Sequence, residues 1–411
     1  MTADPDQRIA DPPEPPRALA GLRVIDAATF IAAPFCATLL SEFGAEVIKL
    51  EEPRRGDSLR WLAERHRGEG LWWLQESRNK KTVTCDLRQP EGQAIFRRLA
   101  SKADVVVENF RPGTMESWNL GYDQLAAENR GLIMLRISGY GQTGPAAHRA
   151  GFGRTAQAFG GLTYLAGFPD RPPVVPGSAT IADYVAGLFG AFAVLVAKVH
   201  RDRTGEGQEI DISLYESIFR LLDTLAIVHG ALGTVRERSP FDAPHAAPHS
   251  HYPTRDGKWI AVACSNDKIF ARLCTALDMP ELVGDPRFRT MGERVAHRSE
   301  IDEIVTRFTA ARAVAEVNEL FERYEVPASP IYSIVDIFAD PQYAARDTIV
   351  SHHNERVGTL RMPGVVPRMS KTPGVIRHAG RPLGADTDGV YRELLGMSDE
   401  ELVRLRTNGV I

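Results

Sequence analysis

RVIDAATFIAAPFCATLLSEFGAEVIKL, residues 23–50, holds the pattern that decides the fold. Two short runs rich in β-branched residues, 23–27 and 46–50, are predicted to be strands, and the segment between them is predicted to be a helix. Pro34 favours a helix start and Gly44 favours a helix end. A helix between two strands is typical of a parallel α/β sheet, because each crossover needs a helix to cover the sheet.

The same alternation continues beyond this stretch. Further strands are expected at 82–86, 104–107, 132–137 and 209–213. A helix is expected at 90–102, where Ile95, Phe96 and Leu99 share one face. A long apolar helix is expected at 181–200, after the proline-rich loop PDRPPVVPGS. We therefore predict an α/β fold for the larger part of the chain.

A second, smaller module is predicted later in the chain. The prolines of SPFDAPHAAPHSHYP, residues 239–253, exclude regular structure, whereas the run GKWIAVACS and the helical patterns after it again have α/β character. This layout predicts a small domain inserted into a larger one. The expected boundaries are a disordered lead at 1–18, a large domain at 19–220, a linker at 221–253, a small domain at 254–326, a return linker at 327–345 and the C-terminal part of the large domain at 346–411.

Composition restricts the function classes. The 49 Lys and Arg against 53 Asp and Glu give a net charge of -4, so no basic excess exists to neutralise a nucleic acid or an anionic membrane. The uncharged apolar stretch 184–197 is shorter than the roughly 18 residues of a membrane span. The acidic, proline-rich N-terminus lacks the pattern of a signal peptide. We expect a cytoplasmic protein with no nucleic-acid or membrane partner.

Patterns that suggest a bound group have simpler interpretations. GYGQTG, residues 139–144, matches the GxGxxG pattern of dinucleotide sites, but Pro145 follows it and no helix opens there, so a glycine-rich loop is favoured. His245, His249 and His251 have no cysteine or carboxylate at metal-binding spacing, so loop histidines are favoured. The four scattered cysteines are expected to be reduced, buried thiols. No metal site is expected.

Asp183 stands where the loop VVPGSATIA meets the long apolar helix. A carboxylate at this position is stabilised by the dipole of the helix N-terminus, and the small residues around it leave room for a ligand. Two interpretations stay open from these residues alone. Asp183 is either a carboxylate that serves the helix end or a catalytic group.

Several blocks, in the order they have along the chain, resemble the family III CoA-transferases, the formyl-CoA and carnitine CoA-transferase group. The similarity covers nearly everything from Leu19 to the C-terminus. The blocks are VIDAATFIAAPFCATLLSEFGAEVIKLE, RNKKTVTCDLRQPEGQ, ADVVVENFRPGTM, ISGYGQTGP, SATIADYVAGLFGAFAVLVA and HRDRTGEGQEIDISLYES.

The resemblance implies a Rossmann-like large domain, a small α/β domain joined by two long linkers, and an interlocked, ring-like homodimer. It implies that Asp183 is the nucleophile. Many relatives carry an Arg or Lys where this chain has Ser117, so Arg54 or Arg55 is expected to supply that contact with CoA. The other positions that the resemblance assigns to the acyl-CoA are Ile31, Ala32, Arg88, Asn109, Phe110, Arg111, Gly139 and Tyr140.

The implied reaction moves CoA from an acyl-CoA thioester to a carboxylic acid through an aspartyl mixed anhydride and an aspartyl-CoA thioester. CoA is a substrate here, and no permanently bound cofactor is expected. Residues 239–265 lack the glycine runs that cover the active site in formyl-CoA transferase, so the resemblance favours small dicarboxylates such as succinate, malate, mesaconate or itaconate. The sequence does not identify the donor or the acceptor.

Two alternatives remain. The same fold includes 2-methylacyl-CoA racemases, whose catalytic His lies in an AGHD block. This chain has AGFG, which places Phe152 and Gly153 at those positions, and a Phe cannot take a proton. The chain is alternatively a non-catalytic CoA-binding subunit of a heteromer, although the retained Asp183 argues against this.

Overall fold

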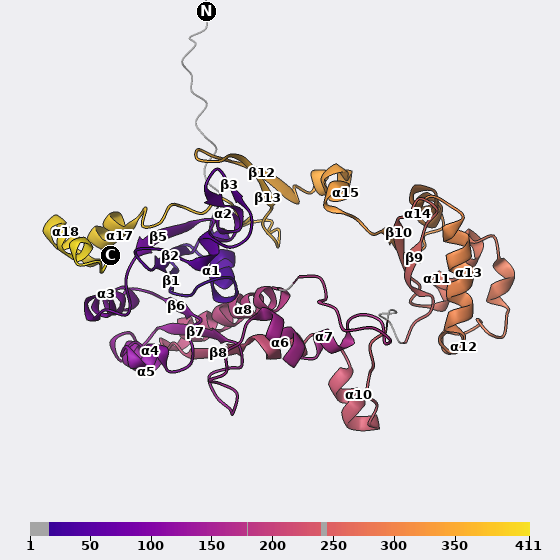
Figure 1. Ribbon diagram of the computed structural model, residues 1–411, viewed down its shortest axis with the longest axis horizontal. Helices are drawn as coiled ribbons and strands as arrows, with labels where there is room; N and C mark the ends of the chain where they lie inside the picture. Colours follow the sequence, from indigo (N-terminus) through magenta and orange to yellow (C-terminus); the bar gives the residue numbers. More distant parts are fainter. Residues whose placement is uncertain (1–15, 179, 240–244) are drawn as a thin grey trace, which may run out of the picture. The chain divides into compact units, whose positions relative to one another are not determined.

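The structure, a computed structural model, describes residues 16–178, 180–239 and 245–411 (Figure 1). These residues form two compact units. Unit 1 contains the described residues up to Thr163, together with Val175–Thr234 and Asp347–Ile411. Unit 2 contains Tyr164–Val174 and Val235–Arg346.

Unit 1 is built on a six-stranded parallel sheet with the order β5-β2-β1-β6-β7-β8. Counted along the chain, this is the order of sheets that bind dinucleotides, in which the ligand crevice opens where the strand order reverses. Here the reversal falls between β1 and β6. The strands are β1 (Arg23–Asp26), β2 (Glu46–Glu51), β5 (Lys80–Thr84), β6 (Val105–Glu108), β7 (Ile133–Ser138) and β8 (Glu209–Ser213).

Helices cover both faces of this sheet, as the near-continuous apolar strands require. The helices α1 (Ala32–Glu42) and α8 (Ile181–Thr204) pack on one face. The other face carries a separate core that includes the C-terminal helices, which lie beside α3 and β5 in Figure 1. The helices on that face are α3 (Pro90–Ala100), α5 (Tyr122–Glu128), α17 (Thr387–Leu395) and α18 (Asp399–Thr407).

Most of the strands and helices predicted for this unit are confirmed. The strand predicted at 82–86 spans Lys80–Thr84 in the structure. Lys80 looks like a surface residue in the sequence, but it is fully buried and its ammonium lies 2.9 Å from Asp26. The apolar helix predicted at 181–200 extends to Thr204, where Gly205 in a left-handed conformation ends it.

The helix α8 approaches α1 closely because glycines face it. A Cβ on Gly187 would lie 2.5 Å from the carbonyl oxygen of Ala32. By length and hydropathy α8 could cross a membrane, and 39% of its most apolar window is buried. A single helix of this kind is weak evidence for a membrane span, since the core helix of a globular domain passes the same test, and one face of α8 packs on α1.

Unit 2 has a three-stranded antiparallel sheet with the order β11-β10-β9. Its strands are β9 (His249–Pro253), β10 (Trp259–Ala263) and β11 (Ala328–Pro330), and its larger helices are α11 (Asp267–Ala276), α13 (Arg298–Ala310) and α14 (Val314–Arg323). The prediction that 239–253 excludes regular structure is wrong for β9, because an edge strand tolerates a proline at its end. His249 and His251 therefore lie on a strand rather than in a loop, and residues 240–244 lie outside the described part.

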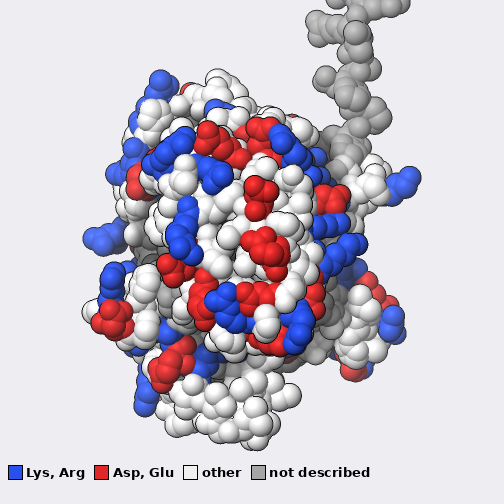
Figure 2. All heavy atoms as spheres, turned by 90° about the vertical axis from the view of Figure 1, so that its right-hand side faces the viewer, with Lys and Arg blue, Asp and Glu red and all other residues white. Residues whose placement is uncertain are grey.

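The remaining elements are short. They are η1 (Ser58–Arg60), β3 (Arg65–His66), β4 (Glu69–Gly70), α2 (Leu71–Glu76), α4 (Thr114–Ser117), α6 (Gly153–Phe159), α7 (Leu162–Leu165), α9 (Leu214–Phe219), α10 (Leu225–Leu232), η2 (Pro280–Val283), α12 (Met291–Ala296), α15 (Ile334–Ala339), α16 (Pro341–Ala345), β12 (Ile349–Asn354) and β13 (Gly358–Pro363). The four cysteines are free and buried, as predicted. On the face that Figure 2 presents, Lys and Arg are interspersed with Asp and Glu.

Candidate active site

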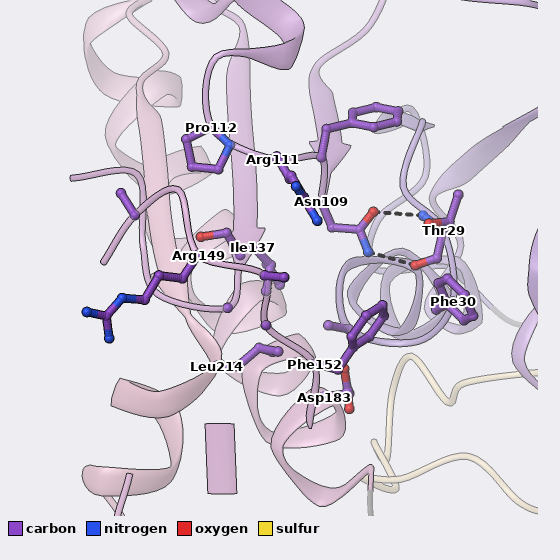
Figure 3. A pocket seen from close by; sticks show the side chains of 17 residues that line it. Thr29, Phe30, Asn109, Arg111, Pro112, Ile137, Arg149, Phe152, Asp183 and Leu214 are labelled. Atoms are coloured by element: carbon purple, nitrogen blue, oxygen red, sulfur yellow. Dashed lines mark hydrogen bonds between the residues drawn. The ribbon is translucent and has the colours of Figure 1, made fainter. Parts of the chain in front are cut away.

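A cavity of about 200 Å³ lies at the carboxyl ends of β1, β6 and β7, where the strand order reverses (Figure 3). All of its walls belong to unit 1. The lining residues are Thr29, Phe30, Ala32, Asn109, Phe110, Arg111, Pro112, Ile137, Ser138, Gly139, Ala147, Arg149, Ala150, Gly151, Phe152, Asp183 and Leu214.

Asp183 enters this cavity from the first turn of α8. Its carboxylate is partly buried, and no described side chain donates a hydrogen bond to it or forms an ion pair with it. Burial raises its pKa to about 6, and the only opposing contribution comes from its own backbone N–H. A carboxylate without a partner, held away from water, suits nucleophilic attack better than an ion-paired one.

Asn109, which follows β6, binds the backbone of Thr29 with both ends of its amide. Thr29 donates its N–H to Asn109 Oδ1 at 2.8 Å, and Asn109 Nδ2 donates to the Thr29 carbonyl at 2.7 Å. Figure 3 draws this pair as two dashed lines. The side chain of Asn109 therefore holds the loop after β1 in place.

A buried network of charged side chains also holds the loop after β1. Lys49 on β2 donates to the Ala28 carbonyl and lies 2.9 Å from Asp57 Oδ2. The other oxygen of Asp57 accepts the N–H of Phe30 at 3.0 Å, and Phe30 has a φ of 62°. Asp26 lies 3.6 Å from Lys49. A left-handed conformation is strained for Phe, so these contacts maintain it.

This network was not predicted from the sequence. Its signal was present, since Asp26 and Lys49 are charged residues inside runs that were predicted to be buried strands. Burial lowers the pKa of Lys49, but the carboxylates of Asp26, Asp57 and Glu51 outweigh this effect and raise it to about 12. Buried charges of this kind require partners, and the partners come from distant segments.

Two aromatic rings stand beside Asp183. Phe30 and Phe152 meet edge to face with ring centroids 6.0 Å apart. Phe152 is brought there by a close backbone contact, because a Cβ on Gly139 would lie 2.8 Å from the Cα of Gly151. The glycines of GYGQTG thus serve loop packing, and the next helix, α6, begins only at Gly153.

A second cavity of about 240 Å³ shares Thr29 and Phe110 with the first. Arg88 and Trp118 also line it, and Trp118 packs edge to face on Phe110 with centroids 5.3 Å apart. Arg88 is bound to Asp86 at 2.8 Å. Because the two cavities share walls, one elongated ligand could occupy both.

The residues that the resemblance assigned to acyl-CoA fall into three groups. Ala32, Asn109, Phe110, Arg111 and Gly139 line the cavity of Asp183, and Arg88 lines the second cavity.

The others lie elsewhere. Ile31 is buried in an apolar cluster, and Tyr140 packs on Phe159 with ring centroids 5.2 Å apart. Arg54 and Arg55 are exposed and line neither cavity; Arg55 borders a separate one.

The fold agrees with the comparison to known proteins. A family model, CoA-transferase family III, matches residues 19–387. The chain therefore belongs to this family and is a CoA-transferase.

Two curated relatives and one solved structure illustrate the similarity. The chain is 50% identical over 409 residues to the succinyl-CoA–L-malate CoA-transferase beta subunit of Chloroflexus aurantiacus, covering 96% of this chain and 98% of that protein. It is 43% identical to the succinyl-CoA–D-citramalate CoA-transferase of the same organism, covering 97% and 99%. A CaiB/BaiF family protein from Brucella suis matches with a TM-score of 0.81 and 33% identity, covering 92% and 99%.

Proposed function

We propose that this enzyme transfers CoA from succinyl-CoA, or a similar acyl-CoA, to a small dicarboxylic acid such as malate, with Asp183 as nucleophile. The observation that carries the proposal is the partly buried carboxylate of Asp183, without an ion-pair partner among the described residues, in a cavity at the reversal of strand order. The names of the similar enzymes support the choice of substrates.

The reaction proceeds in four exchanges. The Asp183 carboxylate attacks the thioester carbonyl, the C–S bond breaks, and CoA leaves as a thiolate. The thiolate then attacks the Asp183 carbonyl of the mixed anhydride and releases the first acid, which leaves an aspartyl-CoA thioester. The second acid attacks the carbonyl of this thioester, the C–S bond breaks, and CoA leaves again as a thiolate, which gives a new mixed anhydride. The thiolate then attacks the acyl carbon of the new anhydride. This gives the new acyl-CoA and releases the Asp183 carboxylate.

The site suits these intermediates. Water would hydrolyse an anhydride, and the aromatic pair Phe30 and Phe152 places apolar surface beside Asp183. Backbone N–H groups near Gly139, which lines the same cavity, are suited to stabilise the oxyanions.

We place the acyl-CoA along the two adjoining cavities. The thioester end lies beside Asp183, and the nucleotide end lies toward Arg88 and Trp118. Arg111 lines the first cavity and forms no ion pair with any described carboxylate, so its charge is available to a phosphate or a substrate carboxylate.

The racemase alternative is not favoured. Phe152 occupies the position of the racemase histidine and lines the cavity beside Asp183. No histidine is among the described residues that line this cavity. Exchange of a proton between two bases therefore lacks its second base.

We propose further that two chains form the interlocked dimer that the resemblance implies, with unit 2 as the inserted domain. The outward face of α8 exposes Leu188, Phe192 and Val196 by 61%, 66% and 52%. These side chains lie four residues apart on one helix face. Beside them is an apolar cavity of about 630 Å³, lined from α1, α8 and residues 366–369. A partner surface would remove this apolar area from water.

The partner is expected to be a second copy of this chain. Relatives with this fold carry the names alpha and beta subunit, so a related second chain is the competing candidate. Light scattering of the chain expressed alone separates the two. Twice the mass of one chain together with transferase activity is expected, whereas an inactive monomer would contradict the homodimer.

The nucleophile is tested by trapping. The protein is incubated with succinyl-CoA and treated with hydroxylamine, which converts an activated aspartyl carbonyl to a hydroxamate that peptide mass spectrometry locates. We expect the hydroxamate at Asp183, and loss of both trapping and transfer in Asp183→Asn and Asp183→Ala. Protein without acyl-CoA is the control. Turnover retained by both variants would overturn the assignment.

A further inference from the structure

The first turn of α8 carries the proposed nucleophile, yet the side chain of its N-cap residue forms no capping hydrogen bond. Thr180 is the N-cap residue, and its hydroxyl accepts no hydrogen bond from the turn. Helix starts usually rely on such a cap to satisfy their free N–H groups. Backbone carbonyls accept the N–H groups here, since Asp183 N–H donates to the Thr180 carbonyl at 3.0 Å. Side-chain contacts of the neighbouring residue add to what holds Asp183, the third residue of the helix.

Tyr184 provides such a contact at the same turn. Its hydroxyl donates to Glu76 Oε1 at 3.0 Å and accepts from Trp72 Nε1 at 2.9 Å. Both partners lie on α2 (Leu71–Glu76), and Glu76 is only 5% exposed. The ring of Tyr184 also meets Phe35 of α1 edge to face, with centroids 4.8 Å apart.

The three contacts act together with the close packing of Gly187 on α1 to set the rotation of the first turn about the helix axis. Neighbouring residues on a helix point about 100° apart. With the Tyr184 ring held on α1 and its hydroxyl held on α2, Asp183 is directed into the cavity. Burial and the nearby Glu76 carboxylate raise the pKa of Tyr184, so its hydroxyl keeps the proton that it donates.

We propose that Tyr184 is a positioning residue for CoA transfer, which orients Asp183 through its hydrogen bonds to Glu76 and Trp72. This inference rests on the proposed role of Asp183 as nucleophile. A nucleophile displaced by about 1 Å loses on the order of 100-fold in rate, because near-attack geometry is lost. Tyr184 lines neither of the two cavities, so its loss should affect the chemical step rather than acyl-CoA binding.

The test is Tyr184→Phe, which keeps the ring on Phe35 and removes only the hydroxyl. We expect kcat to fall at least tenfold while KM for acyl-CoA changes less than twofold. A purely structural hydrogen bond would lower the melting temperature and leave kcat per folded enzyme unchanged. That outcome would overturn the inference.

The chain offers a matched control in unit 2. Tyr252 donates to Asp302 Oδ1 at 2.5 Å and is 1% exposed, so Tyr252→Phe removes another hydrogen bond between a buried tyrosine and a carboxylate. Tyr252 lines neither cavity. Its variant should lose stability and keep its kcat. An equal loss of kcat in both variants would show a general effect of destabilisation and count against Tyr184.

A second pair of variants tests the acceptor. Glu76→Gln keeps an oxygen that can accept from the Tyr184 hydroxyl, so it should retain most of the activity, whereas Glu76→Ala should resemble Tyr184→Phe. Combining Tyr184→Phe with Glu76→Ala should cost much less than the sum of the two losses, because both remove the hydrogen bond between Tyr184 and Glu76. Additive losses would contradict the shared hydrogen bond.

Asp183→Asn is assayed in parallel. If it is inactive while Tyr184→Phe has the kcat of the unaltered enzyme, only the positioning role fails. If Asp183→Asn remains active, the proposed nucleophile fails, and the role of Tyr184 fails with it.

Discussion

The two sides of the cavity around Asp183 are held in different ways. The loop after β1 is bound at three successive residues: Ala28 by Lys49, Thr29 by Asn109, and Phe30 by Asp57. The opposite side, the start of α8, follows a proline-rich loop and has no side-chain cap. The loop after β1 is therefore held by contacts at three successive residues, whereas the start of α8 is held by its packing on α1 and by the contacts of Tyr184.

The difference has a physical reason. The loop after β1 includes Phe30 in a left-handed conformation, which persists only where surrounding contacts enforce it. The start of α8 is in regular helical geometry and carries no such strain. It can therefore present an unpaired carboxylate, at the cost of partial burial without a partner.

The largest expected effect on stability comes from removing a contact that holds the loop after β1. Asp57→Ala leaves the buried ammonium of Lys49 without its closest carboxylate and the N–H of Phe30 without an acceptor. Removing one member of a buried ion pair costs about 3 kcal/mol or more, so the free energy of unfolding measured in urea should fall by this amount.

Asp57→Asn is the control for this variant, because its amide oxygen can still accept from Phe30 and Leu59. It should lose less stability than Asp57→Ala. If Asp57→Ala unfolded at the same urea concentration as the unaltered protein, the contacts of Asp57 with Lys49 and Phe30 would not stabilise the fold. The proposed difference between the two sides of the cavity would then be wrong.

A smaller effect is expected on the pH dependence of the rate, in which Asp183 titrates and Lys49 does not. The proposed nucleophile, Asp183, must be ionised to attack, and burial raises its pKa to about 6. The rate at low acyl-CoA concentration should therefore rise with pH through about 6 and fall roughly tenfold for each unit well below it. Lys49, which contacts the loop after β1, has a pKa of about 12 and keeps its charge throughout this range.

The raised pKa of Asp183 also makes the stability of the fold depend on pH. Because the folded pKa of Asp183 lies above its ordinary value of 3.8, folding favours the protonated form, and the associated stability is lost as the pH rises from about 4 to about 6. Asp183→Asn should remove this pH dependence in thermal unfolding measurements. A pH–rate profile that is flat between pH 5 and pH 7 would contradict the pKa that the structure assigns.

Much of the fold could be predicted from local pattern. The alternation of β-branched runs and helical segments indicated the strands of the parallel sheet to within a few residues, because apolar strands covered on both faces have a distinct composition. Lys80 shows the limit of this reasoning. It lies outside the predicted strand, and its partner Asp26, 54 residues earlier, explains its burial.

The candidate site likewise has features that the sequence revealed and features that it did not. Asp183 and the Asn109–Arg111 block were identified from motifs, and the structure brings them to one cavity. The motifs did not reveal that the side chain of Asn109 is used by the backbone of Thr29. Tyr140, assigned from the same kind of motif, packs on Phe159 outside the lining of that cavity.

By itself, the sequence determined the parallel α/β sheet, the family and the residue proposed as nucleophile, because these follow from periodicity and from short blocks of neighbouring residues. Only the tertiary structure decided which groups hold that residue. The hydroxyl of Tyr184 meets Glu76 across 108 residues of chain, and Asp57 meets the backbone of Phe30 across 27. Such contacts depend on the register of strands and the packing of helices, which no local stretch of sequence encodes.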